Sequence, residues 1–112
     1  MSDIEYKTGD ADLLGVQLLQ YNRPIDLTGY EIKFVMKHTS GSRIEIPCTL
    51  NGVVDGVYVP GTSGGVTVPF TSAHLATAGN YRGEFVITKG TSIVAHLPNG
   101  NNYYTITIWE SL

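Results

Sequence analysis

Three histidines and two closely spaced aspartates are the side chains of this protein that could hold a metal ion. His38, His74 and His96 lie far apart along the chain, so none of them has the short spacing typical of zinc ligands. Asp10 and Asp12 form a D-x-D motif, but the glycine and glutamate that complete a calcium-binding EF-hand loop do not follow it. We therefore expect exposed or hydrogen-bonding histidines, a solvated pair of aspartates, and no bound metal or other cofactor.

The single cysteine, Cys48, excludes an intramolecular disulfide and a cysteine-based zinc site. In the alternating run 43–50 it falls on the same face as Ile44, Ile46 and Leu50. An apolar face predicts a buried, inert thiol rather than a nucleophile, because a reactive thiol needs an exposed and electropositive setting.

Residues that could catalyse hydrolysis occur without the spacing that the chemistry requires. No serine lies in the G-x-S-x-G motif of a nucleophile elbow. The glycine-rich segment 61–65, GTSGG, lacks the lysine and the following helix of a phosphate-binding loop. The glutamates that could supply a carboxylate pair for glycoside hydrolysis lie on polar sides of alternating segments, where we expect them to face solvent: Glu31, Glu45, Glu84 and Glu110. The sequence thus predicts a protein that is not an enzyme.

Aromatic and threonine side chains form a stripe near the C-terminus. Tyr103 and Trp109 fall on the polar side of the alternating segment 103–109, with Thr105 and Thr107 between them. Tyr58 joins this set if 53–59 is a strand. Such a stripe on an outer face is typical of a subunit contact, of a sugar-binding platform or of ordinary surface. We take these five residues as the candidate interaction surface and leave the three roles open.

Length and charge exclude other classes. The chain has 112 residues, which predicts one domain over 1–112, and a formal net charge of −3. Its lysines and arginines are scattered along the sequence: Lys7, Arg23, Lys33, Lys37, Arg43, Arg82 and Lys89. This scatter argues against nucleic-acid binding, which needs clustered cations. The first ten residues contain no apolar signal region, and no apolar run is long enough to span a membrane, so we expect synthesis in a cytosol and no membrane insertion.

The elements that must position these residues are strands, because alternation with period two dominates the chain. The clearest predicted strands are 30–37, 43–50, 66–70, 81–87 and 103–109, and the shorter ones are 13–20, 53–59 and 92–97. Pro47 cannot donate to a strand ladder, so 43–50 should lie at a sheet edge. Seven or eight short strands, with no long helix, predict an all-β antiparallel sandwich.

One stretch, TSAHLATAGNYRGEFVIT at 71–88, begins like a helix and ends like a strand. A single helical turn near 72–77 would cross between the two sheets and place Leu75 over the open end of the core. Gly79 would let the chain leave the turn, and Tyr81 would begin the next strand. A turn, a glycine and a tyrosine in this order resemble the tyrosine corner before strand F of immunoglobulin-like domains, in which the hydroxyl bonds to the backbone. The predicted core is Leu18, Ile32, Phe34, Met36, Val68, Phe70, Leu75, Tyr81, Phe85, Ile87, Ile106 and Ile108.

Two stretches, NRPIDLTGYEIKFVMK at 22–37 and VPFTSAHLATAGNYRGEFVIT at 68–88, resemble the immunoglobulin-like N-terminal domain of siphophage baseplate upper proteins. The matching positions are Pro24, Asp26, Leu27, Thr28, Gly29, Phe70, Thr71, Leu75, Gly79, Tyr81 and Phe85. Gly83 occupies the place of the second cysteine of antibody domains, so no disulfide accompanies the corner.

The resemblance implies an immunoglobulin-like sandwich and a structural role in a phage tail tip or baseplate. It implies contacts with other tail proteins, self-association as a trimer or hexamer, and a place in the virion after synthesis in the host cytoplasm. Because no coiled coil or receptor-binding head follows, we expect a small accessory protein rather than the adhesin. The alternatives are a carbohydrate-binding module and a host-receptor-binding accessory protein.

Overall fold

The larger of two packed layers is a sheet of six strands. In a computed structural model that describes residues 3–98 and 103–112, its strands are adjacent in the order β1 (Asp3–Lys7), β13 (Tyr104–Trp109), β11 (Gly79–Lys89), β5 (Glu31–His38) and β6 (Arg43–Pro47). The sixth strand, β12 (Ser92–Leu97), pairs with the second half of β11. One edge of β11 therefore bonds to β5 while the other bonds first to β13 and then to β12.

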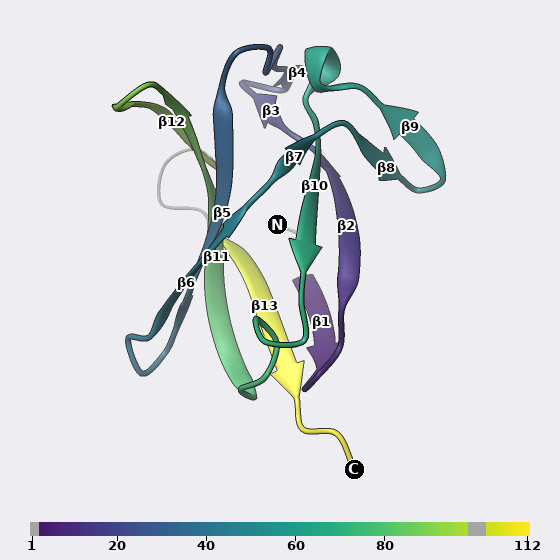
Figure 1. The fold of residues 1–112 in the computed structure, drawn as a ribbon, viewed down its shortest axis with the longest axis vertical. Coiled ribbons are helices and arrows are strands. Elements are labelled where there is room, and N and C mark those ends of the chain that lie inside the picture. The colour runs from purple at the N-terminus through teal and green to yellow at the C-terminus, as the bar shows by residue number, and fades with distance from the viewer. Residues whose placement is uncertain (1–2, 99–102) are drawn as a thin grey trace.

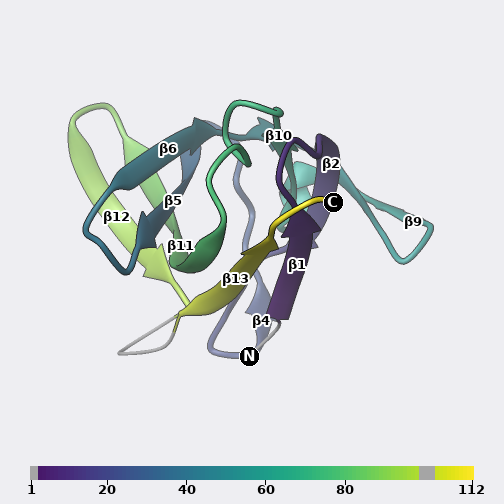
Figure 2. The ribbon, with the colours of Figure 1, turned by 90° about the horizontal axis from the view of Figure 1, so that it is seen from below.

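The smaller layer contains β2 (Asp12–Gln17), β10 (Gly65–Phe70) and β7 (Thr49–Leu50). Two short hairpins complete the chain: β3 (Leu19–Gln20) with β4 (Arg23–Pro24), and β8 (Gly52–Val54) with β9 (Val57–Val59). A 3-10 turn, η1, spans Gly61–Ser63. Figure 1 shows the two layers side by side, and Figure 2 shows the β8–β9 hairpin projecting beyond the smaller one.

The hydrophobic core lies between the layers, where the alternating apolar side chains of both sheets meet. All twelve residues predicted for the core are buried. Leu27, Ile46, Val66 and Leu97 are buried with them. The predicted immunoglobulin-like sandwich is confirmed with one departure, since β1 pairs with β13 in parallel. The two strands come from opposite ends of the chain, so no short hairpin forces them to be antiparallel.

The predicted strand 43–50 is divided between the two sheets. Its first part, β6, is the last strand of the larger sheet, which confirms the edge position expected from Pro47. After Cys48 the chain continues as β7 in the smaller sheet. Pro47 ends the ladder because it has no N–H to donate, and the chain is then free to cross to the other layer.

The segment 53–59 is a hairpin rather than one strand. Asp55 and Gly56 form its turn with φ of +50° and +80°, the left-handed values of a tight hairpin. Val53 pairs with Tyr58 across the turn. The Asp-Gly pair was the signal for this turn in the sequence, and the alternation on either side of it obscured the reversal.

The crossing from β10 to β11 is a hydrogen-bonded turn over 72–75 that does not continue into a helix. The Leu75 N–H donates to the Thr71 carbonyl at 3.3 Å. The Thr71 N–H donates to His74 Nδ1, and the His74 N–H faces Thr71 Oγ1. Side-chain bonds of this kind compete with a helix, and one turn is too short to propagate. The only 3-10 turn of the described residues lies at η1, in the glycine-rich segment 61–65.

The tyrosine corner predicted from the sequence is present. Tyr81 is buried, and its hydroxyl donates to the Thr77 carbonyl at 2.8 Å. Leu75 is fully buried, and its carbonyl accepts the Gly9 N–H at 3.0 Å. This hydrogen bond connects the turn after β1 to the crossing. Gly79 has φ of +140°, and a Cβ there would overlap the imidazole of His38. The short turn before β11 therefore closes one end of the core with a single leucine.

Candidate interaction surface

The outer face of the larger sheet carries most of the predicted interaction residues. Ile106 and Ile108 of β13 are buried, so Thr105, Thr107 and Trp109 point to the opposite, outer side. The structure thus places these three side chains in one line on one face, as the alternation predicted.

Trp109 is held in place but remains accessible. Its indole N–H donates to Glu5 Oε1 of β1 at 2.9 Å, while 56% of the residue's surface is exposed. The Thr107 hydroxyl lies 3.2 Å from Asn80 Oδ1 of β11 on the other side. These contacts connect β13 to both neighbouring strands and present an aromatic ring to solvent.

Tyr103 and Tyr58 lie apart from this line in different ways. Tyr103 precedes β13, and the guanidinium of Arg82 lies 5.6 Å from the centre of its ring. Tyr58 is on the β8–β9 hairpin, which covers the outer side of the smaller sheet. The core therefore separates Tyr58 from Thr105, Thr107 and Trp109, because the single strand that would have aligned it with them does not exist.

A row of cations crosses the same outer face. Arg82 of β11 is directly opposite Lys37 of β5, and Lys37 is directly opposite Arg43 of β6. The cations are scattered along the chain, but the expectation that they are also scattered in space is wrong for these three. Only the register of the strands aligns them, and no local pattern carries that register.

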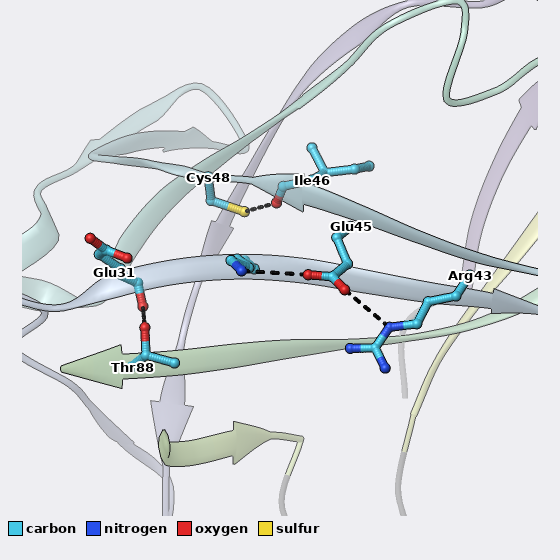
Figure 3. Close-up of polar contacts among 7 residues, drawn as sticks. Glu31, Arg43, Glu45, Ile46, Cys48 and Thr88 are labelled. Carbon is cyan, nitrogen blue, oxygen red and sulfur yellow. Dashed lines mark hydrogen bonds and ion pairs between the residues drawn. The ribbon is translucent and has the colours of Figure 1, made fainter. Parts of the chain in front are cut away.

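The next row combines an apolar residue with two carboxylates. Glu84 and Glu45 are the cross-strand neighbours of Val35, which is 8% exposed although it points outward. Glu45 forms ion pairs with Arg43 at 3.3 Å and with Lys33 at 3.5 Å (Figure 3). Both pairs are well exposed, so each contributes little to stability.

A concavity of about 530 Å³ opens where the two rows meet the β5–β6 turn. Its lining includes Val35, the three aligned cations, Glu84 and Tyr103, with His38 and Thr39 at one side. A second concavity, of about 290 Å³, lies near the β3–β4 hairpin and is lined by Tyr21, Asn22, Leu97 and Tyr104 among others.

Two of the three histidines, His38 and His74, make structural hydrogen bonds, whereas His96 lies exposed on β12. His38 Nδ1 accepts the Ser40 N–H at 3.0 Å, and its Nε2 lies 3.3 Å from the Ala78 carbonyl. His74 is engaged with Thr71 in the crossing turn. Within residues 3–98 and 103–112, no three His, Cys, Asp or Glu side chains are grouped closely enough to hold a metal ion.

Cys48 lies at the junction between β6 and β7, half-buried rather than fully buried. Its thiol points to the Ile46 carbonyl, with Sγ 3.6 Å from the oxygen (Figure 3). Burial raises the pKa of this thiol to about 12. The thiolate that a nucleophile requires is therefore scarce at neutral pH, in agreement with the expected inert role.

The two aspartates support the turn between β1 and β2. Asp10 accepts the Lys7 N–H at 2.8 Å, and Asp12 accepts the Tyr6 hydroxyl at 2.6 Å. Burial, and then the bond to Asp12, raise the pKa of Tyr6 well above its ordinary value. The D-x-D motif thus orders a turn in this structure.

Among the described residues, no helix has the length and the apolar composition needed to span a membrane.

Comparison with known proteins supports the fold. No protein-family model matches the chain, and no curated protein sequence matches it. Among solved structures, it is similar to the N-terminal domain of phage TP901-1 ORF48, with a TM-score of 0.61 and 11% sequence identity. The similarity covers 99% of this chain and 86% of that one. At this identity the match establishes a shared fold.

Proposed function

We propose that the protein is a structural, non-enzymatic component of a phage tail tip or baseplate that acts through protein–protein contacts. The observation that carries this proposal is the fold match to a domain of a phage protein over 99% of the chain. The resemblance of residues 22–37 and 68–88 to the N-terminal domain of baseplate upper proteins supports the same conclusion from an independent source, the sequence motifs.

The side chains of the structure fit this role. His38, His74 and Cys48 make local hydrogen bonds. The outer face of the larger sheet presents the exposed ring of Trp109. The line of Thr105, Thr107 and Trp109 combines exposed area with uncharged hydroxyls, a composition that is inexpensive to desolvate at an interface. In this proposal the partners are other tail proteins, and a trimer or hexamer forms where the same contact repeats around the tail axis.

The decisive experiment labels virions of the phage that encodes the chain with an antibody against it. We expect label at the tail tip, and capture of at least one tail protein by the purified chain. The Trp109→Ala variant should lose that capture, whereas Tyr21→Ala, which removes an exposed aromatic residue from the β3–β4 turn, should retain it. Virions without label, together with no captured tail protein, would contradict the proposal.

Carbohydrate binding is the second candidate, because more than half of the Trp109 surface is exposed while its N–H is fixed by Glu5. A fixed, open aromatic ring is the type of platform on which sugars stack. A glycan array tests this role: specific binding that disappears in Trp109→Ala would favour it over protein contact.

One folding unit over residues 1–112 is also part of the proposal, supported by the continuous core between the two sheets. A single cooperative transition in urea, seen alike by tryptophan fluorescence and far-ultraviolet circular dichroism, would support it. Two separated transitions would contradict it.

A further inference from the structure

Three positive side chains stand in one cross-strand row on the outer face of the larger sheet. Arg82, Lys37 and Arg43 occupy directly paired positions on β11, β5 and β6. Adjacent strands are about 4.8 Å apart, so the row brings three cations within about 10 Å at the backbone level. They are three of the seven lysines and arginines in a chain whose net charge is −3.

Stability of the fold does not explain this row. Like charges in directly opposite positions of a sheet destabilise it. Within the described part of the chain, neither Lys37 nor Arg82 forms an ion pair, and Arg43 shares Glu45 with Lys33. The sheet thus contains two opposed cations without a carboxylate between them.

The row borders the concavity of about 530 Å³ described above. Val35 supplies a nearly buried apolar surface beside the cations, and Glu84 is the carboxylate of the lining. The Tyr103 ring lies against the guanidinium of Arg82, whose central carbon is 5.6 Å from the ring centre. The cavity therefore combines an arginine stacked on a tyrosine, the ammonium group of Lys37 and an apolar side chain.

We propose that this pocket binds the carboxylate side chains of an acidic segment on a partner protein. The proposal rests on the proposed function in that it names the chemistry of the docking partner. A guanidinium binds a carboxylate through two parallel hydrogen bonds, and Lys37 adds a point charge beside it. A segment with two acidic residues matches Arg82 and Lys37, the two cations of the row for which the described residues supply no ion pair.

Two other classes of ligand fit the site less well. A long polyanion such as a nucleic acid would extend beyond the pocket, over a molecule of net negative charge that repels it. A saccharide would stack on an open aromatic face, but the guanidinium of Arg82 lies over the Tyr103 ring.

Titration of the purified chain with triglutamate, a short acidic peptide, tests the pocket. We expect binding that weakens in about 0.3 M sodium chloride, and that weakens about tenfold or more in Arg82→Gln and in Lys37→Gln. The matched control is Arg23→Gln on β4, which removes the same charge outside the pocket and should change binding less than about twofold. Equal losses in all three variants, or no binding by the unaltered chain, would overturn the proposal.

Thermal unfolding of the same variants separates a binding role from a structural one. Because Lys37→Gln relieves repulsion with Arg82 and Arg43, we expect its midpoint temperature to stay equal or rise. A marked fall would show that the row serves the fold and would overturn the proposal. Tighter binding of trigalacturonate than of triglutamate would replace the protein partner by an acidic saccharide. If the titrations show no binding but the antibody still labels the virions, this pocket is ruled out and the proposed tail role is retained.

Discussion

Two eight-residue segments outside the two main sheets contact the rest of the protein in different ways, one through a side chain and the other through backbone. The crossing at 71–78 sends a fully buried leucine, Leu75, into the end of the core. The β8–β9 hairpin at 52–59 lies outside the smaller sheet and contacts it through backbone, because a Cβ at Gly15 or Gly65 would overlap the carbonyl oxygens of Val53 or Val59.

The difference shows two ways of fixing an irregular segment. The crossing depends on side-chain volume, supported by the hydroxyl of Tyr81. The hairpin depends on the absence of side chains at Gly15 and Gly65, because its backbone packs directly against these two positions of the smaller sheet. Removing atoms should therefore damage the first region, and adding atoms should damage the second.

The largest effect is expected at the crossing. Leu75→Ala should lower the free energy of unfolding by about 2–5 kcal/mol, because it opens a cavity at a fully buried site. Urea unfolding followed by fluorescence measures this loss. A change below about 0.5 kcal/mol, the range of surface substitutions, would mean that Leu75 does not close the core.

The reverse change should damage the hairpin contact. Gly15→Ala should cost about 1–3 kcal/mol, since the new methyl group meets the backbone of Val53 rather than a side chain that can move. The matched control is Gly61→Ala, whose methyl group would meet the Leu50 side chain, with the nearest atom at 3.2 Å, rather than backbone, and should cost less. Hydrogen exchange should accelerate at the amides of β8 and β9 in Gly15→Ala. Equal stability of the two variants would remove the contrast between the regions.

The hydroxyl of Tyr81 should contribute a smaller amount to the crossing. Tyr81→Phe should cost about 0.5–1.5 kcal/mol, because it leaves the Thr77 carbonyl without this donor. Tyr21→Phe at an exposed position serves as the control and should leave the free energy of unfolding unchanged.

The pH dependence of the Tyr81→Phe variant gives a second measurement. Burial raises the pKa of Tyr81 above its ordinary value of 10.0. The stability that this shift contributes is complete below pH 10 and is lost as the pH rises through the raised pKa. The phenylalanine variant should therefore lose less stability than the unaltered protein at alkaline pH. Parallel curves for the two proteins would contradict a buried Tyr81 hydroxyl.

The smallest effect is expected at the outer side of the hairpin. Tyr58→Ser should change stability by less than about 0.5 kcal/mol, because Tyr58 is 62% exposed and the hairpin is held by backbone. Thermal unfolding measures it. A loss comparable to that of Gly15→Ala would show that side chains of the hairpin, rather than its backbone, hold it to the sheet.

Much of the fold was predictable from local pattern. Period-two alternation predicts which side of a strand faces the core. It identifies Phe34, Phe85 and Ile106 as core residues without any information on which strands pair. The order of turn, glycine and tyrosine likewise predicted the corner at Tyr81, because its residues are close in sequence.

The candidate surface was predictable only in part. Thr105, Thr107 and Trp109 share a face because they share a strand. Tyr58 does not join them, since Asp55 and Gly56 reverse the chain before it. The pocket was not predicted, since its residues come from different strands.

By itself, the sequence determined most of the strands, the side of each that is buried, and the crossing with its leucine, because each of these depends on residues a few positions apart. It did not predict β1, which pairs with a strand from the other end of the chain. The tertiary structure alone decided that 43–50 serves two sheets and that Lys37, Arg43 and Arg82 form one row. The physical reason is that alternation specifies a face but not a neighbour. Register arises from the packing of the whole core, and it places charges that are distant in sequence side by side.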